Sequence, residues 1–210
     1  MNHRIMLLAT GIGLFIVFLI YTYVVAREYV NQLDFDVMVR VQDNIPVRLD
    51  PFFSSFSLIG SFELTALVFS IAVIVHSWKK WRRLLILSSF FFFHVVELLF
   101  KSIIDQVGPP FMFHRYALDY HFPSTYISTD FFSYPSGHMG RTALLTGLFA
   151  YIIWKSNVSK IVKVGMWGIL GGIFIVMFVS RISLGEHWFS DVVGGALLGF
   201  AFAAFSVVLW

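Results

Sequence analysis

The segment IMLLATGIGLFIVFLIYTYVVA, from Ile5 to Ala26, contains no charged side chain. A helix needs about 20 mostly apolar residues to cross the hydrocarbon core of a bilayer, so this segment predicts a transmembrane helix. It is longer than the apolar region of a secretory signal, about 7–15 residues, and we interpret it as a retained first span. Five further stretches predict spans of the same kind: Ser57–Val75, Leu84–Phe100, His138–Trp154, Val162–Val179 and Ser190–Trp210.

The composition also favours a membrane protein. Of the 210 residues, 58% are hydrophobic and 13% are charged, whereas a soluble domain carries about 25% charged residues. The length favours a single domain over residues 1–210. There is no cysteine, which excludes disulfides and thiolate metal ligands. We therefore expect an all-α integral membrane protein with six transmembrane helices.

Basic residues cluster in every second connection. A net charge of +3 divided among short clusters is typical of topology signals rather than of a nucleic-acid surface, so we expect no nucleic-acid partner. With six spans, the clusters fall on one side, which the positive-inside rule makes cytoplasmic together with both termini. The clusters consist of His3 and Arg4, then Lys79, Lys80, Arg82 and Arg83, and finally Lys155, Lys160 and Lys163.

The other connections, Arg27–Phe56, Lys101–Gly137 and Arg181–Phe189, then lie on the outer side of the membrane. Most of the unusual polar residues stand in these connections or at the helix ends beside them. They are Lys101, Ser136, His138, Arg181, His187 and Asp191. Alternating topology therefore predicts one extracytoplasmic site in a multi-pass protein of the cell membrane.

The run Pro135-Ser136-Gly137-His138 stands at the start of the fourth predicted span. Serine is a favoured N-cap, and glycine lets another group approach the backbone closely. The free N–H groups and positive dipole end of a helix start bind phosphate, and His138 would lie in the first turn. Taken alone, the run favours a simple helix cap beside an interfacial histidine.

His187 and Asp191 are four residues apart, so they share a face of a helix. A carboxylate that accepts from one imidazole nitrogen fixes the tautomer and leaves the other nitrogen free to attack. The guanidinium of Arg181 is suited to clamping a phosphate. The alternative is a surface pair beside a juxtamembrane anchor. A metal site is the weaker interpretation, because no third carboxylate or cysteine accompanies the pair.

Together these segments resemble the type 2 phosphatidic acid phosphatase superfamily of membrane lipid phosphatases. The family pattern Pro-Ser-Gly-His is complete at Pro135–His138, and Ser-Arg-x5-His-x3-Asp is complete from Ser180 to Asp191. The region that carries the resemblance runs from Lys101 to Asp191. The resemblance implies the six-span helical bundle of this family, which is haloperoxidase-like.

The resemblance also implies a role for each matching residue. His187 would be the nucleophile that forms a phosphohistidine, Asp191 would stabilise its imidazolium, and His138 would be the general acid. The groups implied to hold phosphate oxygens are Lys101, Ser136, Gly137 and Arg181. No metal ion or other cofactor is implied, because the cations and the helix start supply the positive charge.

The first family pattern, Lys-x6-Arg-Pro, is incomplete. Lys101 and Pro109 are in place, but the arginine position is Gly108. The loss of one guanidinium would remove a contact worth about 2–4 kcal/mol in the transition state. Two arginines are candidates to replace it: Arg141, in the first turns of the fourth predicted span, and Arg115, in the outer loop.

Arg141 has two other interpretations: it could pair with Glu97, or it could hold His138 in place. His94, Glu97 and Lys101 share one face of the third predicted span. We expect Glu97 either to hold Lys101 in place or to form a buried ion pair between two helices.

The predicted function is metal-independent hydrolysis of a lipid phosphate or diphosphate at the outer membrane–water interface. Candidate substrates are phosphatidylglycerophosphate, phosphatidate and undecaprenyl diphosphate, a polyprenyl carrier. Two alternatives stay open: a lipid phosphotransferase that uses the same phosphohistidine, and a non-catalytic relative that binds phospholipid. A channel or transporter is disfavoured, because the polar residues gather at one outer face rather than near the midplane. The sequence does not indicate an oligomeric state.

Overall fold

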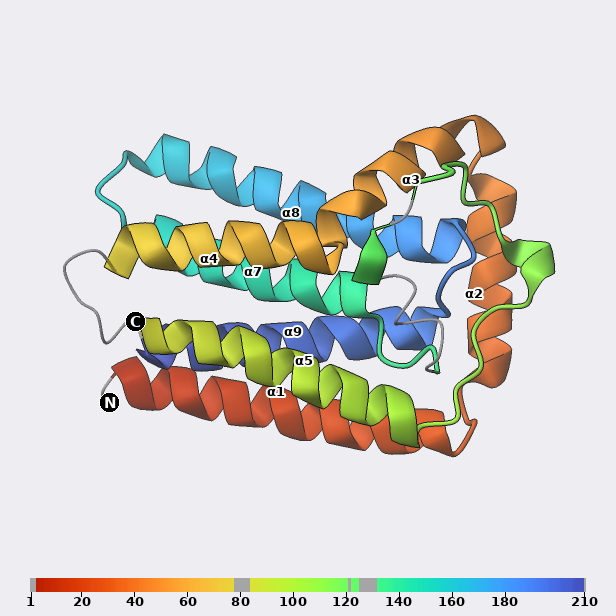
Figure 1. The fold of residues 1–210 in the computed structure, drawn as a ribbon, viewed down its shortest axis with the longest axis horizontal. Coiled ribbons are helices and arrows are strands. Elements are labelled where there is room, and N and C mark those ends of the chain that lie inside the picture. Colours follow the sequence, from red (N-terminus) through yellow and green to blue (C-terminus); the bar gives the residue numbers. More distant parts are fainter. Residues whose placement is uncertain (1–2, 78–83, 121, 125–131, 210) are drawn as a thin grey trace.

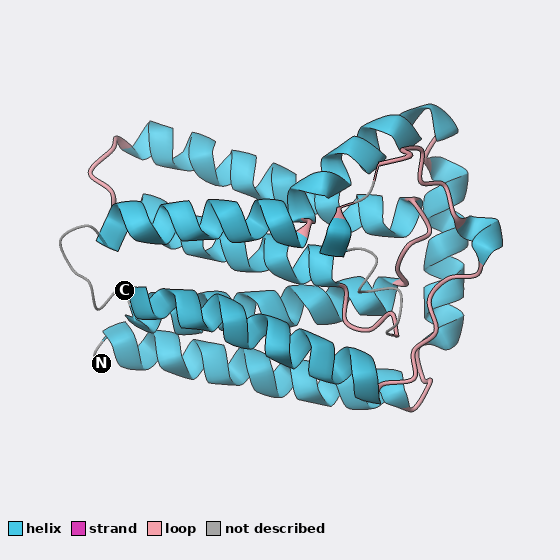
Figure 2. Cartoon of the chain, viewed as in Figure 1, coloured by secondary structure: helices cyan, strands magenta, loops and turns pink. Residues whose placement is uncertain are grey.

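The structure, a computed structural model, describes residues 3–77, 84–120, 122–124 and 132–209. All regular secondary structure in these residues is helical, which confirms the predicted all-α class (Figure 2). The predicted basic cluster at Lys79, Lys80, Arg82 and Arg83 lies outside the described residues, as does the final residue of the sixth predicted span, Trp210.

Long helices lie lengthwise beside one another and form a bundle (Figure 1). They are α1 (His3–Ala26), α4 (Phe62–Ser77), α5 (Ile86–Ile103), α7 (Gly137–Lys155), α8 (Lys160–Ser183) and α9 (Phe189–Leu209). At one end of the bundle, α2 (Asn31–Asn44) runs across the direction of these helices. The shorter elements are α3 (Asp50–Ser57) and the 3-10 turns η1 (Val47–Leu49), η2 (Leu58–Gly60) and η4 (Phe111–Phe113).

By length and composition, four helices of the described chain can each cross a membrane: α1, α5, α8 and α9. A fifth span would be the pair Val47–Gly60 and Phe62–Val75, which is bent by 49°. This bend divides the predicted span Ser57–Val75. The helix α7 is not among these candidates, because it carries polar and charged side chains and packs inside the bundle. The count of six spans therefore stays a prediction.

The helices α7 and α9 pack with their backbones in close contact. A Cβ atom added at Gly199 would overlap the carbonyl oxygen of Gly140, and one added at Gly195 would overlap that of Ser136. Small residues at helix interfaces allow such an approach in membrane proteins. As a result, the start of α7 lies against the first turns of α9, where the Ser136 N–H donates to the Asp191 carbonyl over 2.9 Å.

The two ends of the bundle carry different connecting segments. Both termini and the connection from α7 to α8, with Lys155 and Lys160, lie at one end (Figure 1). The opposite end carries α2, η4 and the connection from α8 to α9. The polar residues that the sequence singled out gather at this second end. Which end faces the cytoplasm stays a prediction from the basic clusters.

We predict that Gly199→Val destabilises the protein through the α7–α9 contact. Overpacking a tight interface costs about 1–3 kcal/mol, and here the added atoms meet the backbone. The thermal midpoint, measured by far-ultraviolet circular dichroism in detergent, should fall. The matched control is Gly168→Val on α8, where an added Cβ meets nothing within 4 Å. Equal midpoints for the two variants would contradict the prediction.

Candidate active site

The connection between α8 and α9 places His187 at the mouth of the bundle. Gly185 has a φ of +68°, a conformation that favours glycine, and a Cβ there would overlap the Phe113 carbonyl. The backbone N–H groups of Glu186 and His187 both donate to the Arg181 carbonyl, over 3.3 and 3.2 Å. These bonds hold the loop over the last turn of α8 and set His187 directly before α9.

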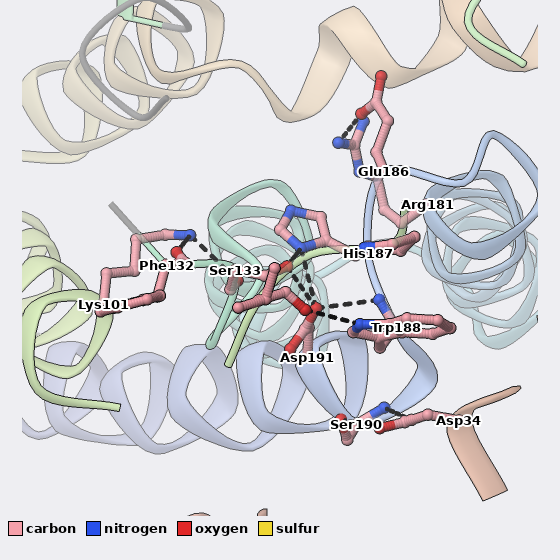
Figure 3. A network of polar contacts seen from close by, with 12 residues as sticks. Asp34, Lys101, Phe132, Ser133, Arg181, Glu186, His187, Trp188, Ser190 and Asp191 are labelled. Carbon is pink, nitrogen blue, oxygen red and sulfur yellow. Dashed lines mark hydrogen bonds and ion pairs between the residues drawn. The ribbon is translucent and has the colours of Figure 1, made fainter. Parts of the chain in front are cut away.

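The structure brings His187 and Asp191 together, as the spacing predicted (Figure 3). Asp191 is fully buried, and its Oδ2 accepts from the backbone N–H of Trp188 over 2.9 Å. The same oxygen accepts from the Ser133 hydroxyl over 2.5 Å and lies 3.4 Å from His187 Nδ1. Ser133 Oγ is itself 2.9 Å from His187 Nδ1. The carboxylate and the hydroxyl therefore hold one edge of the imidazole.

His187 is held in a form suited to nucleophilic attack. Its side chain is buried, and both the burial and the charges of Arg181 and Lys101 keep the pKa of His187 well below its ordinary value. The ring is therefore neutral at pH 7. Its Nδ1 faces Ser133 and Asp191, while Nε2 bonds to no group in the described part of the chain.

Two predicted phosphate ligands, Lys101 and Arg181, are buried cations at this mouth, 5% and 3% exposed. Lys101 Nζ donates to the carbonyl oxygens of Phe132 and Ser133, over 3.3 and 3.1 Å. Arg181 pairs through Nη2 with the carboxylate of Glu186, which lies in the loop just before His187. Both cations are therefore tied to the segments that flank the imidazole.

Two buried hydrogen-bond donors at this mouth have no partner among the described residues: Ser136 Oγ and Arg181 Nε. Ser136 is the N-cap of α7, yet its side chain makes no capping bond. Buried donors are normally paired, and the N–H groups of a first helical turn are free to bind an anion. An anion that bound here would satisfy the hydroxyl, the guanidinium and the start of α7, which includes Gly137, together.

His138 lies in the first turn of α7, as predicted, at the same end as His187. Its carbonyl accepts from the Thr142 hydroxyl, and its ring makes no hydrogen bond to the described residues. Across from it lies Gly60 in η2, where an added Cβ would stand 3.1 Å from the His138 Cβ. The ring is therefore available to a substrate.

Arg141 takes one of its predicted roles, as the partner of Glu97. Its Nη1 lies 3.3 Å from Glu97 Oε2, and its Nε donates to the Gly60 carbonyl over 2.8 Å. Glu97 forms no ion pair with Lys101 in the described structure, so the expected support of Lys101 by Glu97 is replaced by this buried pair. The pair faces the unsubstituted side of Gly137, where an added Cβ would overlap the Glu97 carboxylate. It joins α5, α7 and η2 behind the phosphate pocket.

Arg115 lies outside the cluster around His187. Its Nε pairs with Asp50 at 3.0 Å, and its two terminal nitrogens donate to the carbonyls of Gln42 and Ile45, over 3.2 and 3.1 Å. Its backbone N–H donates to the Leu184 carbonyl. Since all three guanidinium nitrogens are engaged, we do not carry Arg115 forward as a phosphate ligand. It fastens the outer loop to α2 and α3.

The position of the missing family arginine does reach the site. A Cβ added at Gly108 would stand 3.6 Å from both Cβ and Oγ of Ser133, which is ordinary van der Waals contact. No side chain projects from this position toward the His187–Asp191 pair. The neighbouring Val107 carbonyl accepts from the Trp188 indole N–H over 2.8 Å, so the loop packs on the mouth without a third cation.

Sequence reasoning missed three residues that shape this mouth: Ser133, Asp34 and Glu186. Glu186 and Ser133 stand beside recognised motifs, but no periodicity indicates where such loop side chains point. Asp34, on α2, caps the start of α9: its two oxygens accept from Ser190 N and Ser190 Oγ, over 2.7 and 2.6 Å (Figure 3). Asp34 and Ser190 are 156 residues apart in the sequence, so no local sequence pattern could predict their contact.

Comparisons with known proteins identify the family of the chain. Residues 82–210 match the family model described as PAP2 superfamily. Phosphatidylglycerophosphatase B of Bacillus subtilis (strain 168) is 30% identical over 145 residues, which are 67% of this chain and 64% of that protein. The chain thus matches slightly less than two thirds of the length of this relative.

Two solved structures share the fold. One is described as the first transmembrane PAP2 type phosphatidylglycerolphosphate phosphatase, from Bacillus subtilis; it superposes with a TM-score of 0.73 at 23% identity and covers 94% of each chain. The other is LpxE of Aquifex aeolicus, with a TM-score of 0.60 at 18% identity, covering 83% of this chain and 94% of that one. At these identities, the likeness shows a common helical architecture.

We predict that Arg115→Ala lowers stability and leaves turnover unchanged. The substitution leaves Asp50 buried without its cation, which costs about 3–5 kcal/mol. The thermal midpoint in detergent should fall, while kcat of the folded fraction stays at the wild-type value. Arg40→Ala, at an exposed arginine of α2, is the matched control. A loss of kcat at an unchanged thermal midpoint would contradict the prediction and support Arg115 as a phosphate ligand.

Asp34 should make stability depend on pH. Burial raises the pKa of the Asp34 carboxyl from 3.8 to about 6, against the hydrogen bonds from Ser190, and the charge of Asp191 adds to the rise. Because this pKa is higher in the folded state, the fold favours the protonated carboxyl. That contribution is complete below about pH 4 and is lost as pH rises through about 6.

The measurement is the thermal midpoint of the wild type minus that of Asp34→Asn. This difference should fall between about pH 4 and 7. Parallel curves for the two proteins would show that the Asp34 carboxyl titrates alike in the folded and unfolded states, against the prediction.

Proposed function

Because the chain belongs to the PAP2 superfamily, we propose that it is a phosphatase that hydrolyses a membrane lipid phosphate through a phosphohistidine on His187. The observation that carries the proposal is the state of His187. Its Nδ1 is held by Ser133 and Asp191, and its Nε2 is unengaged among the described residues. Two buried cations stand beside the imidazole. A neutral imidazole with one bound and one free nitrogen is an oriented nucleophile.

In the first step, His187 Nε2 attacks phosphorus and the bond from phosphorus to the lipid oxygen breaks. His138 donates its proton to that departing oxygen. The His187 ring becomes a positively charged imidazolium, and the nearby carboxylate of Asp191 stabilises this charge. Lys101, Arg181, the Ser136 hydroxyl and the Gly137 N–H bind the equatorial oxygens and offset the charge that develops there.

In the second step, His138 is the base. It accepts a proton from a water molecule, and the hydroxide attacks the phosphohistidine. The P–N bond breaks, inorganic phosphate leaves, and His187 is neutral again. The proton that His138 lost in the first step is thereby restored, so the cycle balances without a co-reactant.

The protein's own cations supply the electrostatic role that a metal ion has in other phosphatases. At the mouth, Asp191 Oδ2 accepts from Ser133 and Glu186 pairs with Arg181, while Asp191 Oδ1 has no partner among the described residues. Among these residues no group of three or more His, Asp or Glu side chains could hold a metal ion. We therefore propose that the reaction needs no metal ion. The arrangement of cations, hydroxyl and helix start suits a phosphoryl group.

For the substrate, we propose a lipid phosphate whose headgroup enters the mouth while its acyl or prenyl tails stay in the leaflet. The mouth lies at the end opposite both termini (Figure 1), and we propose from the basic clusters in the sequence that this end faces the outer side of the membrane. The relative in Bacillus subtilis is named for phosphatidylglycerophosphate, so we rank this lipid first. Phosphatidate and undecaprenyl diphosphate are the other candidates.

The test is phosphate release by purified protein in detergent with each of the three lipids, with and without EDTA. We expect turnover that survives EDTA and falls by about 10⁴-fold or more in His187→Ala. His114→Ala is the matched control, since the His114 ring bonds to the Pro109 carbonyl away from the pocket.

Three outcomes would change the proposal. Full activity in His187→Ala would remove the nucleophile, and activity lost with EDTA would indicate a metal enzyme. Phosphate that appears on an added alcohol rather than in solution would indicate a phosphotransferase. A wild type that binds these lipids and releases no phosphate would be a non-catalytic relative.

A further inference from the structure

We propose that Ser133 is a positioning residue whose hydroxyl connects Asp191 to His187 and fixes the imidazole proton on Nδ1. The effect of Ser133 on the catalytic rate rests on the proposed function. The position of the proton on the His187 ring does not depend on that function. Ser133 stands two residues before Pro135, the first residue of the Pro-Ser-Gly-His run, in the loop that leads into α7.

The distances favour a path through the hydroxyl. His187 Nδ1 and Asp191 Oδ2 are 3.4 Å apart, longer than the usual 2.7–3.2 Å of an N–H···O bond (about 2.9 Å at the mode). Ser133 Oγ lies 2.9 Å from Nδ1 and 2.5 Å from Oδ2. The short contacts therefore run from imidazole to hydroxyl to carboxylate, and Figure 3 shows Ser133 beside both groups.

The directions of these bonds follow from the groups themselves. An ionised carboxylate only accepts, and Asp191 Oδ2 already accepts from Trp188 N–H. Ser133 has a single hydroxyl proton, so it must donate that proton to Asp191. Toward His187 the hydroxyl can then only accept, which places a proton on Nδ1 and leaves the Nε2 lone pair for phosphorus.

The backbone of Ser133 is fixed on both sides. Its N–H donates to the Gln106 carbonyl over 2.9 Å, and its own carbonyl accepts from Lys101 Nζ over 3.1 Å. Ser133 therefore contacts a predicted phosphate ligand through its backbone and the nucleophile through its side chain. A shift of Lys101 toward a bound phosphate would be transmitted to the hydroxyl that orients the ring.

The same geometry serves the intermediate. When Nε2 bonds to phosphorus, the imidazolium retains its Nδ1 proton and gains a positive charge. A hydrogen bond from an ionised donor is shorter and stronger than a neutral one. The hydroxyl then lies between the cation and the Asp191 carboxylate, and the whole path is strengthened as the charge develops.

The kinetic test compares Ser133→Ala, Ser133→Thr, Asp191→Asn and the double variant Ser133→Ala/Asp191→Asn, each checked for a wild-type thermal midpoint. We expect Ser133→Ala to lower kcat by about 10–100-fold, the range for loss of a group that orients a reacting residue, at an unchanged KM. Ser133→Thr, which keeps the hydroxyl, should restore most of kcat. Ser102→Ala, at an exposed serine beside Lys101, is the matched control.

The double variant decides whether Ser133 acts through Asp191. Residues that act as one unit are non-additive, so the double variant should be no slower than Asp191→Asn alone. Wild-type kcat in Ser133→Ala, or a double variant that loses the product of the two single effects, would overturn the proposal.

A spectroscopic test does not depend on activity. In wild-type protein labelled with ¹⁵N-histidine, and with His187→Gln to assign the signal, the ring of His187 should show a protonated Nδ1 and a bare Nε2. The opposite tautomer would overturn the proposal. If the wild type hydrolyses none of the lipids, the proposed function fails while this spectrum still decides where the proton lies.

Discussion

The backbone contact between α7 and α9 holds the start of α7 against Asp191, and the proposed site is built around this contact. Gly195 and Gly199 let α9 approach the backbone of α7, so the Ser136 N–H reaches the Asp191 carbonyl at 2.9 Å. The start of α7, proposed to bind phosphate, and the carboxylate of Asp191, proposed to orient His187, are thereby held at a fixed separation. A side chain at either glycine would move the two apart and divide the pocket.

A second constraint is the burial of charge within an apolar bundle. Isolated buried ions are strongly disfavoured, so they are paired or hydrogen-bonded. Glu97 and Arg141 pair with each other behind the pocket, and Asp50 Oδ2 pairs with Arg115. At the mouth, Ser136 Oγ and Arg181 Nε have no partner in the described chain, and the second carboxylate oxygens of Asp50 and Asp191 have none either. The unsatisfied donors stand where a phosphate is proposed to bind, whereas the two ion pairs stabilise the walls.

The bundle also shows how a membrane protein accommodates one polar helix. Because α7 packs inside the bundle, its threonines, His138 and Arg141 face other helices. The helix α8, in contrast, is largely exposed on its apolar faces. Composition therefore identifies α8 as a span more readily than α7, although α7 carries His138, one of the two proposed catalytic histidines.

The sequence by itself determined the all-α class, the family, and the spacing that brings His187 to Asp191, because these depend on apolar runs and on separations within one helical turn. It also indicated the Glu97–Arg141 pair as one of three options for Arg141. Only the tertiary structure showed that Arg141 pairs with Glu97 and that Arg115 pairs with Asp50. It alone also showed that Ser133 contacts Asp191 and that Asp34 contacts Ser190. These depend on which loop side chains meet across separations such as the 58 residues from Ser133 to Asp191, and no local pattern encodes such meetings.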